Sequence, residues 1–280
     1  MPAKKSATKS PRTNPEKKFA IVTGASSGIG RELAKLLAKE GHDLFICSGS
    51  EKIKEVVPEL EAAGAMVAAI QADLAKFEGV EKFWQAVSAT GRKIDIAALN
   101  AGVGVGGDFI RETSLEDELN MIQLNVTSTV HLAKHVAKKM VEQGDGKILI
   151  TSSIAGTMPT PLETVYGATK AFDLSFAAGL RAELKDTGVT VTALQPGPTN
   201  TDFFRRAGLE GTKVGDEGKH DSEPSEVAKQ GYDALLAVKD HIYAASMKTK
   251  IQGELGKFIP SSVKAEMHRK QAEPKTGTDK

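Results

Sequence analysis

Tyr166 and Lys170 place a phenol and an ammonium group four residues apart in the sequence. Apolar residues recur every three or four positions from Tyr166 to Ala177, which predicts a helix. Side chains at this spacing project from one helix face, so both groups can act on one small target. A nearby positive charge favours ionised tyrosine and so makes the phenol a better proton donor and acceptor at neutral pH. Alone the pair is weak evidence, because the spacing also occurs by chance.

A glycine-rich turn near the N-terminus suggests which cofactor this pair could serve. The apolar run Phe19–Thr23 is followed by glycines in the pattern G-x-x-x-G-x-G and then by a helix pattern over residues 31–40. A strand, glycine turn and helix in this order let backbone amides approach a pyrophosphate closely. The turn contributes the candidate cofactor contacts Gly24, Ser26, Ser27, Gly28, Ile29 and Gly30.

With Thr23 the turn reads T-G-x-x-x-G-x-G, and with the Y-x-x-x-K pair the chain resembles the short-chain dehydrogenase/reductase family from Phe19 to at least Lys239. The resemblance implies an α/β fold, a three-layer Rossmann-type doubly wound parallel β-sheet flanked by helices. It also implies an NAD(P)-dependent enzyme that transfers hydride between nicotinamide C4 and a carbonyl or secondary alcohol. Family members are usually dimers or tetramers, so a homodimer or homotetramer is expected.

The family pattern carries over to four catalytic candidates: Asn125, Ser153, Tyr166 and Lys170. By resemblance, Tyr166 donates a proton to the carbonyl oxygen and Ser153, 13 residues earlier, hydrogen-bonds that oxygen. Lys170 is expected to hold the ribose hydroxyls and to lower the pKa of Tyr166. Asn125 would support a proton-relay water at a local kink of its helix.

Further cofactor contacts are expected at the ends of later strands, where such sheets bind dinucleotides. An acid after the second strand would select NAD, but the turn there is Ser48-Gly49-Ser50, and the arginine of many NADP-binding relatives is missing too. NADP is preferred because serine hydroxyls can hydrogen-bond a 2′-phosphate and no carboxylate in this turn repels it; NAD is the alternative. The remaining expected contacts are Ser48, Gly49, Ser50, Asp73, Leu74, Asn100, Ala101, Gly102, Tyr166, Lys170, Pro196, Gly197, Thr199 and Thr201.

The substrate is expected beside Ser153, Tyr166, Met158 and Pro159, in an apolar, proline-stiffened segment that indicates a hydrophobic or acyl-type molecule. Core packing explains the same apolar residues equally well. Two alternatives keep the same fold. One is a non-catalytic NADP-binding sensor or scaffold, and the other is an epimerase or dehydratase that uses the same tyrosine and lysine.

Hydrophobic periodicity gives one domain over residues 19–272, between a basic disordered tail (1–18) and a flexible C-terminal tail (273–280). Asp73 is also a candidate N-cap for a helix over 79–88, and residues 202–224 are expected to form a mobile loop. Other expected strands cover 43–47, 66–70, 94–99, 147–151, 189–195 and 242–245, and other expected helices cover 51–63, 115–143, 225–238 and 255–270.

Charge and cysteine content narrow the function classes. The chain has 37 basic and 36 acidic residues, which gives no reason to expect nucleic acid or membrane as a partner. The lone cysteine, Cys47, forbids an internal disulfide, and a cytoplasmic setting fits best. His131 and His135 have a spacing that could bind a metal, but no third ligand is evident, so no metal site is expected.

Overall fold

Seven apolar runs of the chain form strands, and every pairing between neighbours is parallel. Their order in the sheet is β3-β2-β1-β4-β5-β6-β7. This computed structural model describes residues 17–220, 222–246, 249, 251 and 259–273, so most of the two expected tails lies outside the described residues. The strands are β1 (Phe19–Thr23), β2 (Asp43–Ser48), β3 (Val67–Gln71), β4 (Ile96–Leu99), β5 (Gly146–Thr151), β6 (Val189–Pro196) and β7 (His241–Ala244).

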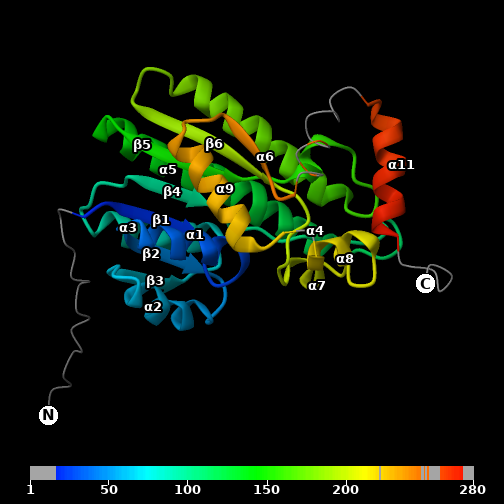
Figure 1. Cartoon of the computed structure of the whole chain (residues 1–280), viewed down its shortest axis with the longest axis horizontal. Helices are drawn as coiled ribbons and strands as arrows, with labels where there is room; N and C mark the ends of the chain where they lie inside the picture. Colours follow the sequence, from blue (N-terminus) through cyan, green and yellow to red (C-terminus); the bar gives the residue numbers. More distant parts are fainter. Residues whose placement is uncertain (1–16, 221, 247–248, 250, 252–258, 274–280) are drawn as a thin grey trace, which may run out of the picture.

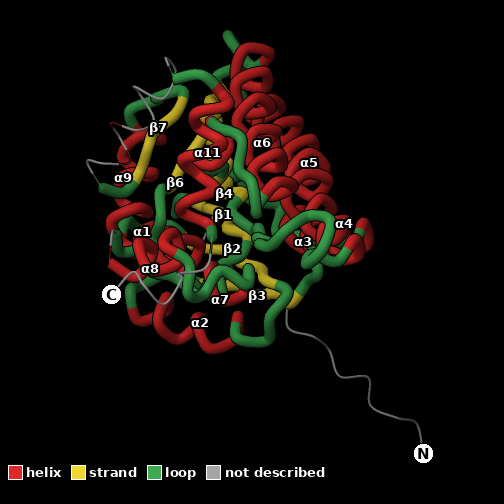
Figure 2. Tube along the Cα trace, turned by 90° about the vertical axis from the view of Figure 1, so that its right-hand side faces the viewer, coloured by secondary structure: helices red, strands yellow, loops and turns green. Residues whose placement is uncertain are grey.

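Helices cover both faces of the sheet, which confirms the three-layer, doubly wound fold (Figure 1). Figure 2 shows the sheet between α1, α2 and α9 on one side and α3, α5 and α6 on the other. The helices are α1 (Gly28–Lys39), α2 (Ile53–Ala62), α3 (Phe77–Ser88), α4 (Leu115–Ile122), α5 (Ser128–Gln143), α6 (Thr164–Glu183), α7 (Phe203–Arg206), α8 (Lys213–His220), α9 (Pro224–Leu236) and α11 (Ser261–Ala272).

Strand β1 contributes side chains to two hydrophobic cores, one on each face of the sheet. All five of its residues are buried, as expected for a central strand of a parallel sheet. Phe19 and Ile21 pack into the core under α3, α5 and α6, whereas Ala20 and Val22 pack into the core under α1, α2 and α9. The alternation follows from the two-residue period of a strand.

The long helix expected over residues 115–143 is interrupted in its middle. Helix α4 runs into a π-helical segment, η1 (Gln123–Thr127), which continues directly as α5. Asn125 lies inside this segment and is completely buried. The local kink expected at Asn125 is therefore present as a π-helical turn, a distortion that is frequent at functional sites.

Two expectations about local structure are wrong. Asp73 is not the N-cap of α3; that position is Lys76, and the Asp73 carboxylate instead accepts a hydrogen bond from the backbone N–H of Ala75 in the preceding turn. Residues 202–224 are not simply a loop, because they contain α7 and α8. Thr212 starts α8 by accepting a hydrogen bond from the N–H of Gly215 at 3.1 Å, and buried Leu209 anchors the segment.

The order in which the chain adds strands to the sheet reverses between β1 and β4. The chain moves outward from β1 to β3 and then returns to β4, on the other side of β1. In a doubly wound sheet this reversal opens a crevice at the carboxyl ends of the strands. Among the described residues, no helix combines the length and the apolar character that a membrane crossing needs.

Candidate active site

The turn between β1 and α1 is shaped by glycines that no other residue could replace without strain. Gly24 and Gly28 have φ angles of 68° and 55°, a region that side chains with a Cβ rarely adopt. A Cβ on Gly30 would lie 2.4 Å from the Gly24 carbonyl oxygen and 2.5 Å from the amide nitrogen of the Asn100 side chain. The backbone amides at the N-terminus of α1 therefore lie close to the end of β4, in a cradle suited to a pyrophosphate.

Thr23 ties the ends of β1 and β4 together. Its hydroxyl accepts hydrogen bonds from the backbone N–H groups of Asn100 and Ala101, at 2.9 and 3.0 Å. The side chain of Asn100 in turn accepts a hydrogen bond from Thr151 at the end of β5. Three strand ends are thereby held in register at the mouth of the crevice.

One cleft of about 370 Å³ runs along these strand ends. Its walls come from the glycine turn, from the ends of β2, β4, β5 and β6, and from α6, α7 and α11. Most of the cofactor contacts expected from the sequence line it: Gly24, Ser26, Ser27, Gly28, Ile29, Ser48, Gly49, Ser50, Asp73, Leu74, Asn100, Ala101, Gly102, Tyr166, Lys170, Pro196, Gly197, Thr199 and Thr201.

Ser153 and Tyr166 meet inside this cleft. Ser153 follows β5, and its hydroxyl accepts a hydrogen bond from the N–H of Ala155 at 3.1 Å, which fixes the side chain at the start of a 3₁₀ turn. The Ser153 side chain is close enough to the Tyr166 hydroxyl to favour its ionised form, and both residues are buried, with 8% of their surface exposed. The Ser153 hydroxyl now donates a hydrogen bond to the carbonyl of Pro196 at 3.4 Å. If that bond is exchanged for a ligand, the serine and the phenol can each donate one hydrogen bond to the same ligand oxygen.

The pKa of Tyr166 is raised, whereas the family resemblance implies that Lys170 lowers it. Burial is the main cause, and the negative charges of Glu163 and Asp173 add to it, while the nearby Ser153 side chain acts in the opposite direction. In this structure Tyr166 is therefore a protonated phenol at neutral pH and a weaker acid than a tyrosine in water.

Lys170 is buried and held by two partners. Its ammonium donates hydrogen bonds to the carbonyl of Thr151 at 2.9 Å and to the carboxylate of Asp173 at 3.0 Å. Asp173 is 1% exposed, and burial raises its pKa although Lys170 opposes that shift. The second oxygen of this carboxylate, Oδ1, has no hydrogen-bond partner within the described part of the chain. Asp173 thus fixes Lys170 beside the end of β5.

Asn125 is hydrogen-bonded to the loop after β4 and to α6. Its side-chain amide donates to the carbonyl of Val103 and to the hydroxyl of Thr169, and its side-chain oxygen accepts from the N–H of Val103 at 2.9 Å. A Cβ on Gly102 would lie 3.2 Å from the Asn125 side-chain oxygen and 3.4 Å from the ammonium of Lys170. The π-helical turn thus clamps the loop after β4, with Gly102 between Asn125 and Lys170.

Comparison with known proteins identifies the family. The family model described as short chain dehydrogenase matches residues 18–210. The chain is 30% identical over 258 residues to the oxidoreductase UcpA of Salmonella typhimurium, and this match covers 88% of the chain and 96% of that protein. The chain belongs to the short-chain dehydrogenase family.

Two further relatives of this short-chain dehydrogenase carry information about cofactors in their names. The chain is 34% identical over 181 residues to the NADP-dependent 3-hydroxy acid dehydrogenase YdfG of Salmonella typhi, covering 64% of this chain and 71% of that protein. A short-chain dehydrogenase from Sphingobium yanoikuyae, solved in complex with NADPH, is similar with a TM-score of 0.73 and 30% identity; the match covers 80% of this chain and 86% of that one. The family assignment makes the present chain an oxidoreductase.

Three of the residues expected at the site do not line the cleft of this short-chain dehydrogenase: Gly30, Asn125 and Pro159. Gly30 lies beneath the turn, where its missing Cβ makes room, and Asn125 acts through Val103 and Thr169. Pro159 is exposed and lies outside the lining of the cleft, whereas its neighbour Met158 lines it. The expectation that Pro159 borders the substrate stays a prediction.

Other functional candidates were missed in the sequence. Asp173 lies three residues after Lys170 on the same helix, a spacing that could have revealed the pair. Helix α11 brings buried His268 next to buried Glu163, with 3.1 Å between the imidazole and the carboxylate, and both residues line the cleft. Outside the cleft, Glu81 of α3 meets His131 and His135, which corrects the expectation that these histidines have no third neighbour with a ligand atom.

Proposed function

We propose that this short-chain dehydrogenase is an NADP-dependent reductase that transfers hydride to the carbonyl group of a mostly apolar substrate, or runs the reverse reaction on a secondary alcohol. The observation that carries the proposal is the buried pair of neighbouring hydroxyl side chains, Ser153 and Tyr166, one helical turn from buried Lys170, in a cleft that begins at a glycine cradle. The bound dinucleotide would supply the hydride.

Tyr166 acts as the general acid in the reduction direction. The phenol is protonated at neutral pH, so it can transfer a proton to the substrate oxygen as negative charge develops there. Ser153 donates a second hydrogen bond to the same oxygen, and the Ala155 N–H holds the serine in place. Burial of both hydroxyls keeps water away from the oxygen on which they act.

Lys170 and Asn125 support this chemistry from the cofactor side. The Lys170 ammonium would bind the hydroxyls of the nicotinamide ribose, while Asp173 and Thr151 hold it in position. Asn125 would support a proton-relay water near Lys170, because its amide fixes the loop that separates the two residues. These two roles rest on the family resemblance together with the proximity of the residues around Gly102.

The glycine cradle supports a dinucleotide, and the turn after β2 supports NADP over NAD. The Ser26 and Ser48 hydroxyls are 2.8 Å apart beside this turn, and the Ser48-Gly49-Ser50 segment has no carboxylate to repel a 2′-phosphate. Serine hydroxyls can also donate hydrogen bonds to phosphate oxygens. The NADPH bound in the similar structure from Sphingobium yanoikuyae points in the same direction.

The far end of the cleft supports a mostly apolar substrate. The ring of Phe203 packs against the ring of Tyr166, with 5.2 Å between their centroids, and Phe203 and Met158 both line the cleft. Apolar walls with few polar groups favour ligands whose main contact is hydrophobic. The buried pair of Glu163 and His268 provides the polar contact in this region that could orient a hydroxyl or carboxyl group of such a substrate.

Fluorescence titration with NADPH and NADH tests the cofactor, and a panel of carbonyl compounds followed by cofactor absorbance tests the chemistry. We expect tighter binding of NADPH and turnover of apolar ketones. Ser50→Asp should weaken NADPH binding selectively, because the added carboxylate repels the 2′-phosphate, while Ser175→Asp on the exposed face of α6 serves as the matched charge control. Tighter binding of NADH would refute the NADP preference, and tight binding without any turnover would favour a sensor or scaffold.

A further inference from the structure

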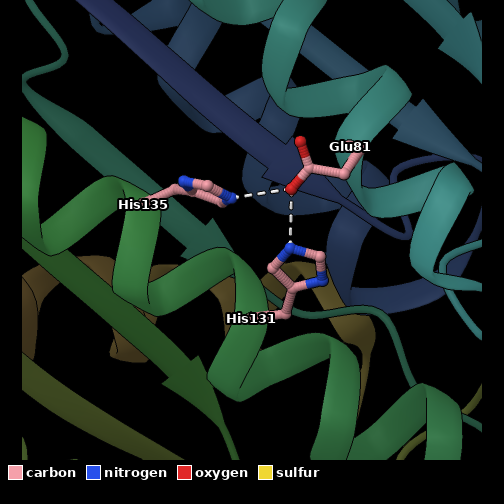
Figure 3. A group of neighbouring side chains, drawn as sticks. All are labelled: Glu81, His131 and His135. Atoms are coloured by element: carbon pink, nitrogen blue, oxygen red, sulfur yellow. Dashed lines mark hydrogen bonds and ion pairs between the residues drawn. The ribbon is translucent and has the colours of Figure 1, made fainter.

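A second cluster of reactive side chains lies between α3 and α5, away from the cleft. His131 and His135 are one turn apart on α5, and both rings direct their Nε2 atoms at a single oxygen of Glu81 on α3 (Figure 3). The distances from these nitrogen atoms to the Glu81 Oε1 atom are 2.7 and 2.9 Å. All three potential ligand atoms lie within 4.8 Å of one another, and none of these residues lines the cleft.

The two imidazole rings are held in these orientations by aromatic neighbours from α3. Phe77 stacks on His131 with 4.6 Å between ring centroids, and Trp84 stacks on His135 with 5.1 Å and an interplanar angle of 12°. Phe77, Glu81 and Trp84 lie four and three residues apart, so they share one face of α3. The rings are thus preorganised, with little freedom left to lose when a ligand binds.

We propose that Glu81, His131 and His135 form a binding site for a divalent transition-metal ion such as Zn²⁺, Cu²⁺ or Ni²⁺. Two imidazoles and one carboxylate are ligands that these ions accept, whereas Mg²⁺ and Ca²⁺ prefer oxygen ligands alone. The ion takes the place of the protons that now bridge the nitrogen atoms and the carboxylate. With bonds of about 2.0–2.2 Å, tetrahedral ligands are about 3.3–3.6 Å apart, so each histidine nitrogen needs to move about 0.4–0.9 Å away from the Glu81 oxygen.

The three proposed ligand side chains are partly exposed, so an ion can reach them from solvent. The side chains of His131, His135 and Glu81 are 17%, 31% and 25% exposed, so the site is partly sheltered but open on one side. Three protein ligands leave one position for water, and the bound ion would connect α3 to α5.

Trp84, the only tryptophan of the chain, reports on this site directly. After treatment with a chelator, the full-length protein is titrated with Cu²⁺, a paramagnetic ion that quenches a nearby indole, while tryptophan fluorescence is recorded. Binding of Zn²⁺, which does not quench in this way, is measured by calorimetry and by the rise in unfolding temperature. We expect saturable quenching with one ion per chain, and stabilisation by Zn²⁺ but not by Mg²⁺.

Three variants separate this site from adventitious binding. Glu81→Gln and His131→Gln each remove one ligand without touching the tryptophan, and each should weaken binding by at least about tenfold. His241→Gln is the matched control, because His241 also pairs with a carboxylate, that of Asp240 at 3.0 Å, but belongs to no group of three possible metal ligands in the described part of the chain. This control should bind like the wild type.

Two results would overturn the proposal. One is wild-type quenching and Zn²⁺ affinity that Glu81→Gln and His131→Gln leave unchanged, and the other is equal stabilisation by Mg²⁺ and Zn²⁺. Circular dichroism and NADPH titration of each variant show that it is folded. Because the cluster lies outside the cleft, loss of metal binding with retained NADPH binding separates this proposal from the proposed reductase function.

Discussion

Lys170 carries a buried positive charge, and Asp173 is the group that makes this burial tolerable. The ammonium and the carboxylate are 3.0 Å apart, and their side chains are 6% and 1% exposed. A charge buried without a partner costs far more than a pair, since neither water nor an opposite charge stabilises it. The raised pKa of Asp173 shows that burial is only partly offset by Lys170. Asp173 is therefore a positioning residue for the lysine.

Replacing one member of this pair should destabilise the protein more than replacing both. We expect Asp173→Leu alone to lower the free energy of unfolding by about 3–5 kcal/mol, because it leaves the Lys170 ammonium buried without an opposite charge. The double variant Lys170→Met with Asp173→Leu should lose less than either Asp173→Leu or Lys170→Met alone. Urea unfolding followed by circular dichroism measures all four free energies. Strictly additive losses would show that the pair does not act as a unit.

The turn between β1 and α1 is the element on which the cofactor side of the cleft depends. Gly30 is the first-turn residue of α1 that packs directly against Gly24 and the side chain of Asn100, which belongs to the loop after β4. Two strands and a helix therefore converge where a single extra carbon atom has no room. The close approach explains why the glycine pattern of this turn is readable in the sequence.

Gly30→Ala should lower the free energy of unfolding by about 1–3 kcal/mol and weaken NADPH binding, because the methyl group forces the turn away from β4. Gly179→Ala is the matched control in α6, where a Cβ would have no atom within 4 Å. This change should stabilise the protein by about 0.5–1 kcal/mol, since alanine favours a helix over glycine. Equal effects of the two changes, measured by urea unfolding and cofactor titration, would contradict the packing argument.

The elements themselves were largely predictable from local patterns. Each expected strand is present within two residues at either end, because buried parallel strands are short apolar runs bounded by turn residues. Helices α7 and α8 were not predicted, since they are short and polar and depend on tertiary anchors such as Leu209. Asp73 was misplaced because an aspartate in a turn before a helix has the same sequence signature as an N-cap.

At the scale of the whole molecule, the sequence indicated the residues that a family motif marks and missed those that only folding brings together. Ser153, Tyr166 and Lys170 are close in sequence and meet in one cleft. His268 and Glu163 are 105 positions apart in the sequence, and Glu81 and His131 are 50 positions apart. Local periodicity therefore cannot predict either contact. The shift of the Tyr166 pKa was misjudged because its main cause is burial, which depends on tertiary packing, and the nearby carboxylates of Glu163 and Asp173 add to it.

The variant Tyr166→Phe shows most directly whether Tyr166 supplies the proton in a hydride-transfer reaction. Buried Tyr232 in α9 lies outside the cleft, so Tyr232→Phe removes the same hydroxyl group as a matched control. With a carbonyl substrate taken from the panel, we predict that Tyr166→Phe lowers kcat by about 10²–10⁴-fold while NADPH affinity is kept, and that Tyr232→Phe turns over like the wild type. A Tyr166→Phe protein that binds NADPH and reduces the carbonyl at the wild-type rate would contradict the account.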